Sequence, residues 1–317
     1  MSILQRNFSS HVNQEAELVG AMKSDKIFPV WLFLGPAGVG KFLVAIKFAK
    51  SLLADRIGED GSLNIDESSE IYKLVDNRIH PDLFVIEDEN ISIDEARSLM
   101  AKVRKSPSLS KRRVVIIKNT EYLNKNVCNS LLKILEEPPQ DAVFILISSN
   151  PGNLPASLLS RTAKLRFSPL SSDAIEAVLK ERGVLNAKEI VNISDGSIDN
   201  AIYISENDGV KLYKDIIASF KEGYEASNKV VARIIEQKLC ENFKPLKALI
   251  IQALHEYVKS INGIEISENF PKSANRERRT EKILQIIDFM NRAESLQLDK
   301  NAIIADVFEQ FFEKDAS

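Results

Sequence analysis

Short apolar runs alternate with amphipathic stretches along the first half of the chain. Five runs are nearly continuous in Val, Ile, Leu and Phe, and they cover residues 29–35, 82–87, 112–119, 142–150 and 163–168. Strands that are buried on both faces of a parallel sheet have this character. Helical patterns lie between them, at 42–53, 94–104 and 125–137. The alternation predicts an α/β fold with right-handed βαβ crossovers, in which helices cover both faces of a parallel five-stranded sheet.

The second half of the chain has a different pattern. The apolar β-type runs stop after Pro169, and residues 171–206 have the character of small helices joined by glycine-containing turns. Further on, Leu246, Leu249 and Ile250 begin a series of apolar residues at helical spacing. The stretch 262–280 is expected to be a loop between two such helices. The sequence therefore predicts an all-helical second half.

Composition and charge narrow the class of protein. The 317 residues are 44% hydrophobic, which is ample for buried cores, and the net charge of −3 argues against a protein that coats nucleic acid. Cys128 and Cys240 are isolated and are expected to be buried thiols, while His11, His80 and His255 offer no ligand pair, so no metal site is expected. No signal-peptide pattern and no apolar run near the ~20 residues of a membrane span occur. We expect a soluble, cytoplasmic protein.

The stretch LGPAGVGKF has the spacing of a phosphate-binding loop. Gly35, Gly38 and Gly40 would let backbone N–H groups face an anion, and Lys41 would reach the phosphates. The pattern then requires Ser or Thr, whose hydroxyl helps to hold Mg²⁺, and this chain has Phe42. Nucleotide binding at this loop is therefore doubtful, and weak binding without hydrolysis stays open.

A second position needed for hydrolysis is also altered. In an active ATPase the strand at 112–119 would end in Asp-Glu, but here it ends in Lys118 and Asn119. A lysine at this place opposes a bound metal ion. Glu121 follows and is expected to be a solvated acid at a helix start. Both changes predict that this chain does not hydrolyse ATP at its own loop.

Four segments carry a resemblance to a known family: WLFLGPAGVGK, HPDLFVIE, NSLLKILEEPP and LLSRTAKLRF. In this order they resemble the clamp-loader proteins of the AAA+ class, and specifically the δ′-type subunits of bacterial DNA polymerase III. The resemblance covers most of the first 205 residues. It implies an AAA+ domain of the P-loop type at 1–168, a small helical lid domain at 169–207 and an all-α collar domain for oligomerisation at 208–317.

The resemblance also assigns a role to the Ser-Arg pair at 160–161. In the family this segment presents an arginine to ATP bound by the neighbouring subunit, where it stabilises the charge on the transferred phosphoryl group. Ser160 and Arg161 are present, and Thr162 stands where the family has Cys. Without the resemblance, Arg161 would be interpreted as an ordinary surface arginine.

Two departures from the family pattern matter. ATP-binding members have an arginine in the second domain after a Gly-Ser-hydrophobic segment, and this chain has Asp199 there, which near the phosphates would repel them. Many members also have a four-cysteine zinc module before the HPD motif, but residues 51–79 contain no cysteine. Zinc is therefore not expected, and the module is absent or rebuilt without metal.

The sequence thus predicts a non-hydrolysing subunit without intrinsic catalysis, working inside a polymerase holoenzyme. The resemblance implies γ/τ-type ATPase and δ-type partners, with the sliding clamp and primer-template DNA reached through the complex and ATP bound by the neighbours. Two alternatives are a working AAA+ ATPase and a stand-alone adaptor or DNA-binding protein. The basic run KVRKSPSLSKRR, residues 102–113, is either a solvated helix end and turn or a contact with DNA phosphate.

Overall fold

The computed structural model describes residues 11–87, 91–123, 125–262, 276–296 and 298–313. The chain divides once into compact units, Met1–Leu170 and Ser171–Ser317, and each is described here by itself. The three-part division expected at 168 and 207 stays a prediction.

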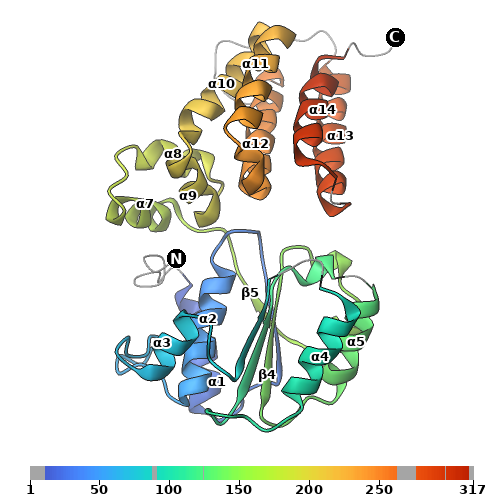
Figure 1. Ribbon diagram of the computed structural model, residues 1–317. Coiled ribbons are helices and arrows are strands. Elements are labelled where there is room, and N and C mark those ends of the chain that lie inside the picture. Colours follow the sequence, from blue (N-terminus) through green and yellow to red (C-terminus); the bar gives the residue numbers. More distant parts are fainter. Residues whose placement is uncertain (1–10, 88–90, 124, 263–275, 297, 314–317) are drawn as a thin grey trace. The chain divides into compact units, whose positions relative to one another are not determined.

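The first unit is built on the parallel five-stranded sheet that the apolar runs predict (Figure 1). The strands are β1 (Val30–Leu34), β2 (Leu83–Ile86), β3 (Arg113–Ile117), β4 (Ala142–Ser148) and β5 (Ala163–Arg166). Their order is β2-β3-β4-β1-β5, and every neighbouring pair is parallel. All the strands therefore begin at one edge of the sheet and end at the opposite edge.

Alternate residues of β1 face two separate cores, which explains its continuous apolar character. Trp31 and Phe33 pack with Phe48 of α2 (Lys41–Ala54) on one face, whereas Leu32 packs with Leu131 of α5 (Lys125–Glu136) on the other. The sheet is consequently buried on both faces.

Helices cover the two faces unequally. Figure 1 shows α1, α2 and α3 on one side of the sheet and α4 and α5 on the other. Their bounds, with those of the short helices, are α1 (Val12–Lys23), α2 (Lys41–Ala54), α3 (Glu70–Asp76), α4 (Ile93–Val103), η1 (Thr120–Tyr122), α5 (Lys125–Glu136), η2 (Pro151–Asn153) and α6 (Ala156–Leu159).

The segment between α2 and β2 is held by ordinary packing and hydrogen bonds. Leu63 is 1% exposed and its carbonyl oxygen accepts a 3.0 Å hydrogen bond from Ser51 of α2. Lys50 of α2 pairs with Asp76 at 3.1 Å and lies over the ring of Tyr72. In the part of the chain that the structure describes, no cluster of three or more His, Cys, Asp or Glu side chains is placed to hold a metal ion.

The second unit is helical, as predicted. Its helices are α7 (Ser172–Glu181), α8 (Ala187–Ile193), α9 (Ile198–Glu206), α10 (Gly209–Glu222), α11 (Tyr224–Glu236), η3 (Leu239–Asn242), α12 (Phe243–Ile261), α13 (Arg276–Ser295) and α14 (Lys300–Phe312). Aromatic rings join three of them: Phe220 of α10 stacks on Phe311 of α14 at 4.2 Å, and Tyr257 of α12 meets the same ring edge-on.

One expectation for this unit is partly wrong. The predicted loop at 262–280 includes 276–280, which form the first turn of α13 because the helix begins at Arg276. The part at 263–275 lies outside the described residues. None of the helices described in either unit is long and apolar enough to cross a bilayer.

Candidate functional site

The loop between β1 and α2 has the backbone that its glycines predict. Gly35, Gly38 and Gly40 all have positive φ, and Gly40 precedes α2 in the left-handed conformation. At Gly35 the reason is also steric, because a Cβ would stand 2.2 Å from the carbonyl oxygen of Phe167 at the end of β5. The loop thus passes close beside β5 and leaves the N-terminus of α2 free to face an anion.

Lys41 is turned into this loop and is 5% exposed. Its Nζ donates hydrogen bonds to the carbonyl oxygens of Gly35 and Pro36 and to Oγ of Ser149, the last at 3.2 Å. The structure therefore brings the predicted glycines and Lys41 together. Protein oxygens already satisfy the lysine ammonium, and a phosphate would have to replace them.

The position expected for a metal ion is lined by an aromatic ring and two cations. The Lys118 ammonium lies 4.4 Å from the centroid of the Phe42 ring, and the Arg78 guanidinium carbon lies 5.6 Å from it. Both cations also form an ion pair with Glu87; the distance from Lys118 Nζ to the Glu87 carboxylate is 3.0 Å. We call Phe42, Arg78, Glu87 and Lys118 the Phe42 cluster. Within these four described residues two cations face one carboxylate, an arrangement that opposes Mg²⁺.

Sequence reasoning identified Phe42 and Lys118 but missed Arg78 and Glu87. Glu87 could have been found, since Ile86 pairs with Ile117 in the parallel register and the residues that follow them meet at the same edge. Arg78 lies in the turn after α3 with a φ of 59°, where no periodic pattern indicates its direction.

The residues after β3 differ partly from expectation. Asn119 has a left-handed backbone, with φ 51°, and begins the turn into η1. The expectation that Glu121 is a solvated acid is wrong: its side chain is half-buried and Oε1 accepts a 2.9 Å hydrogen bond from the backbone N–H of Ser149. Ser149 also contacts Lys41, so this carboxylate braces the phosphate loop through Ser149.

Arg161 lies at the other edge of the sheet, two residues before β5 begins. Its guanidinium donates to the carbonyl oxygen of Ser157 at 2.9 Å and to Ser160 Oγ at 3.4 Å, and it lies 3.5 Å from Glu136 at the end of α5. The side chain is 42% exposed. Two of the segments that carry the family resemblance therefore meet here.

Arg161 and the phosphate loop of the same chain are separated by the length of the strands. The loop follows β1, where strands end, while Arg161 precedes β5, where strands begin. Each residue of a strand advances about 3.3 Å, so five residues put about 17 Å between the two edges. Arg161 is consequently badly placed to act on a nucleotide at Lys41 of its own chain.

Asp199 lies in the first turn of α9, whose N-cap is Ser197. An acid is favoured at this place by the helix dipole, which gives Asp199 a local structural reason. Its expected effect on nucleotide binding stays a prediction.

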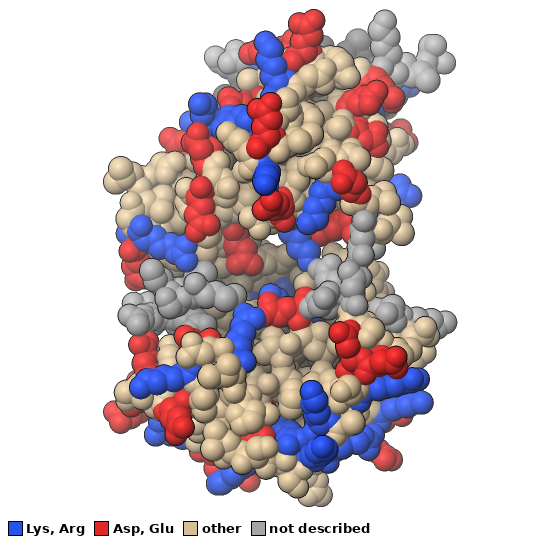
Figure 2. All heavy atoms as spheres, viewed as in Figure 1, with Lys and Arg blue, Asp and Glu red and all other residues tan. Residues whose placement is uncertain are grey.

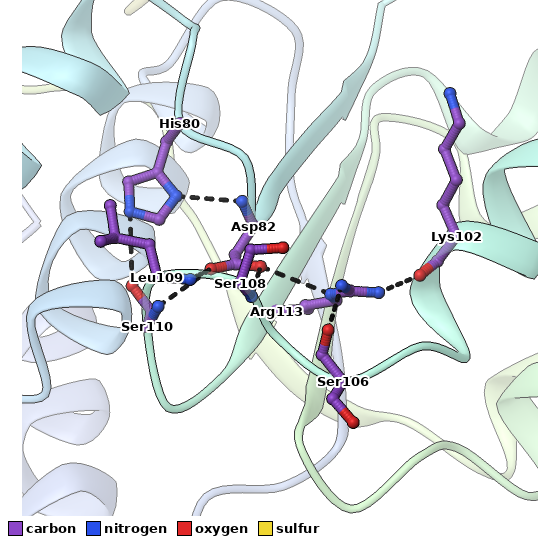
Figure 3. A network of polar contacts seen from close by, with 8 residues as sticks. All are labelled: His80, Asp82, Lys102, Ser106, Ser108, Leu109, Ser110 and Arg113. Carbon is purple, nitrogen blue, oxygen red and sulfur yellow. Dashed lines mark hydrogen bonds and ion pairs between the residues drawn. The ribbon is translucent and has the colours of Figure 1, made fainter.

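The HPD motif forms a buried network at the edge where the strands begin (Figure 3). Asp82 is fully buried and its carboxylate accepts backbone N–H groups of Ser108, Leu109 and Ser110 at 2.7, 2.7 and 2.9 Å. Burial by itself would raise the pKa of Asp82, but these three donors outweigh it and the pKa is lowered. The motif is therefore a clamp on the loop that follows α4.

Arg113 and His80 complete this network. Nε of Arg113 lies 3.5 Å from Asp82, and its terminal nitrogens donate to the carbonyl oxygens of Lys102 and Ser106. His80 accepts the N–H of Asp82 at 3.1 Å, and burial lowers the pKa of the imidazole. The sequence alone predicted neither the place of Arg113 nor that of His80 in this network.

His11 was not foreseen as part of the site either. Its Nε2 lies 2.7 Å from the carbonyl oxygen of Val39 in the phosphate loop, and its ring meets Phe167 edge-on at 4.8 Å. Burial lowers the pKa of His11, which favours the neutral imidazole. His11, which precedes α1, therefore helps to hold the phosphate loop in place through the carbonyl group of Val39.

The sheet order, the glycine-rich loop after β1 and the helical second unit define a P-loop protein of the AAA+ type. The family model for "DNA polymerase III, delta subunit" matches residues 11–171, about half of the chain, and the chain belongs to that family. The match covers the sheet, the phosphate loop and Arg161.

Known proteins agree with this assignment. The chain is 31% identical over 195 residues to DNA polymerase III subunit delta′ of Bacillus subtilis, covering 60% of this chain and 58% of the relative. It is 33% identical over 175 residues to subunit delta′ of Pseudomonas aeruginosa, covering 53% and 52%. The chain thus spans little more than half the length of these relatives.

A solved structure supports the fold over nearly the whole chain. The gamma subunit-related protein of DNA polymerase III from Thermotoga maritima superposes with a TM-score of 0.53 at 17% identity, covering 95% of this chain and 99% of that one. This similarity extends to the helical second unit, which the family model does not reach.

Proposed function

We propose that this chain is a δ′-type subunit of the DNA polymerase III clamp loader. It assists ATP-dependent loading of the sliding clamp onto primer-template DNA, beside γ/τ-type ATPase subunits and a δ-type subunit. It does not hydrolyse ATP itself and supplies Arg161 to the nucleotide of a neighbouring subunit. The observation that carries the proposal is the Phe42 cluster.

The Phe42 cluster supports the absence of hydrolysis because it replaces two metal ligands together. A hydroxyl after Lys41 and an acid after β3 would each contribute to Mg²⁺ binding. Here an aromatic ring and an ammonium attract one another instead, by about 0.5–2 kcal/mol. Restoring one ligand would leave the other position cationic.

The placement of Arg161 supports action on another subunit. Its side chain is partly exposed at the edge where strands begin, and only weak contacts hold it, since a half-exposed pair such as Arg161–Glu136 contributes at most about 1 kcal/mol. A phosphate oxygen can therefore displace Glu136 at small cost. A guanidinium supplied in this way accelerates phosphoryl transfer by about 10³–10⁵-fold in well-studied enzymes.

The test begins with the purified chain and Mg²⁺-ATP. We expect no turnover above background for the wild type or for Phe42→Thr, because Lys118 and Arg78 remain. Mg²⁺-dependent hydrolysis that is lost in Lys41→Ala would establish a working ATPase instead.

The second part of the test recovers the tagged chain from its own cells under gentle conditions. Co-purification of a larger P-loop ATPase that has the Ser/Thr and Asp-Glu motifs, together with the sliding clamp, is the expected result. Recovery of the chain alone would refute membership of a clamp loader and favour an adaptor.

A further inference from the structure

Part of the basic run at 102–113 is left unused by the proposed function. Lys102 lies in the last turn of α4, and Arg104 and Lys105 follow the end of that helix at Val103; the side chains of Lys102, Arg104 and Lys105 are exposed. Within the residues that the structure describes, no acid forms an ion pair with any of them. We call these three residues the open cations. Figure 2 shows basic side chains gathered on the lower part of the first unit, on the side that carries α4 and α5.

The other three basic residues of the run are already neutralised by distant acids. Lys111 pairs with Asp55, and Arg112 lies 3.2 Å from Asp25. Arg113 is the buried partner of Asp82. One short segment therefore contains two kinds of cation, open and paired.

Acids are also missing from the sequence around the open cations. No Asp or Glu occurs between Glu95 and Glu121. The chain as a whole has a net charge of −3, so this acid-free stretch is a local departure from the chain's own balance. Its charge suits a polyanion.

The backbone beside the open cations is fixed in advance. Arg113 holds the carbonyl oxygens of Lys102 and Ser106, and Asp82 holds the N–H groups of the three residues from Ser108 (Figure 3). A ligand would therefore order mainly side chains on binding, which keeps the entropic cost small.

We propose that the open cations bind the sugar–phosphate backbone of DNA. Arg and Lys heads neutralise phosphates, and the exposed hydroxyls of Ser106 and Ser108 are suited to donate to phosphate oxygens. The loop precedes β3, so this surface lies at the sheet edge opposite the phosphate loop and does not use it. DNA binding here is independent of Arg161.

The main alternative ligand is an acidic protein with an apolar pocket for Leu109, which is 53% exposed. Figure 3 shows Leu109 and Lys102 at opposite ends of the network, so the apolar side chain lies apart from this open cation. This separation favours a repeating anion over a mixed protein surface.

Two double variants with equal charge test the proposal. Arg104→Gln/Lys105→Gln removes two open cations, and Lys111→Gln/Arg112→Gln removes two paired ones, so the net charge changes equally. The full-length purified chain is titrated onto a fluorescent duplex of about 24 base pairs, long enough for several phosphate contacts, and anisotropy is followed as salt rises from about 50 to 200 mM.

Each neutralised phosphate gives a slope of about −0.9 in log affinity against log salt. With three contacts the wild-type affinity falls about 40-fold across this range. The open-cation variant, with one contact left, falls only about 3.5-fold. The paired-cation variant and Leu109→Ser keep the wild-type slope.

The proposal is overturned if the wild type does not bind at the lowest salt, or if both double variants lose affinity equally, since only net charge would then matter. It is also overturned if Leu109→Ser weakens binding more than the open-cation variant does. Thermal unfolding of each variant shows that a loss of binding does not come from a loss of folding.

Discussion

Replacing Asp82 by Asn removes one charge from a site that solvent does not reach. Asp82 is fully buried, and the side chain of its partner Arg113 is 6% exposed. The amide of Asn keeps one acceptor oxygen but presents an NH₂ donor to backbone N–H donors. Arg113 would remain buried without its counter-charge. Removing one partner of such a pair lowers the free energy of unfolding by about 3–5 kcal/mol. The weakened hydrogen bonds to the charged carboxylate are part of this loss.

The only tryptophan makes this loss measurable in the first unit alone. Trp31 lies in β1 and is 1% exposed, so its emission reports unfolding of the sheet. With a urea dependence of about 2–3 kcal/mol per M, the expected loss lowers the unfolding midpoint of Asp82→Asn by about 1–2.5 M.

The matched control is Asp94→Asn. Asp94 lies 3.6 Å from Arg97 with its side chain 90% exposed, so its loss should cost at most about 1 kcal/mol. Equal midpoints for Asp82→Asn and Asp94→Asn would refute the view that Asp82 is the clamp of this loop.

Two further predictions concern stability. Burial lowers the folded-state pKa values of His11 and His80, so their contribution to the free energy of unfolding is fully present above the unfolded value of 6.5 and declines as pH falls below it. The urea midpoint should therefore drop between about pH 7.5 and 5.5. A midpoint that does not change over this range would contradict the prediction. Gly35→Ala should cost at least about 2 kcal/mol because its Cβ meets the carbonyl of Phe167, whereas Gly20→Ala, with open space inside α1, should stabilise by about 0.4–1 kcal/mol. A harmless Gly35→Ala in the same urea assay would show that the loop can move away from β5.

The sheet was predictable because its strands are buried on both faces and therefore have unbroken apolar runs. The phosphate loop was predictable from the spacing of its glycines. The positive charge near the expected metal position was predictable because Lys118 directly follows β3. The pairing register of β2 and β3 would have added Glu87 to the predicted site, because the register fixes which residues lie side by side where the two strands end.

Other features depend on contacts that no local pattern encodes. Arg78 reaches Phe42 from a turn with positive φ. Paired and open cations of the basic run look alike in sequence, because Asp25 and Asp55 lie far along the chain from Lys111 and Arg112. Likewise Glu121 could be assigned to solvent only while its hydrogen bond to Ser149 was unknown.

The proposal that Arg161 acts on the ATP of a neighbouring subunit is tested most directly by ATP turnover. The assay uses a complex reconstituted from this chain and the proposed ATPase, δ-type and clamp partners. Arg97→Ala is the control, since Arg97 is also an exposed arginine with one carboxylate partner. With Arg161→Ala the complex should assemble, and turnover at the site facing this chain should fall by about 10³-fold or more, while Arg97→Ala keeps it. Undiminished turnover in an assembled Arg161→Ala complex would contradict the account.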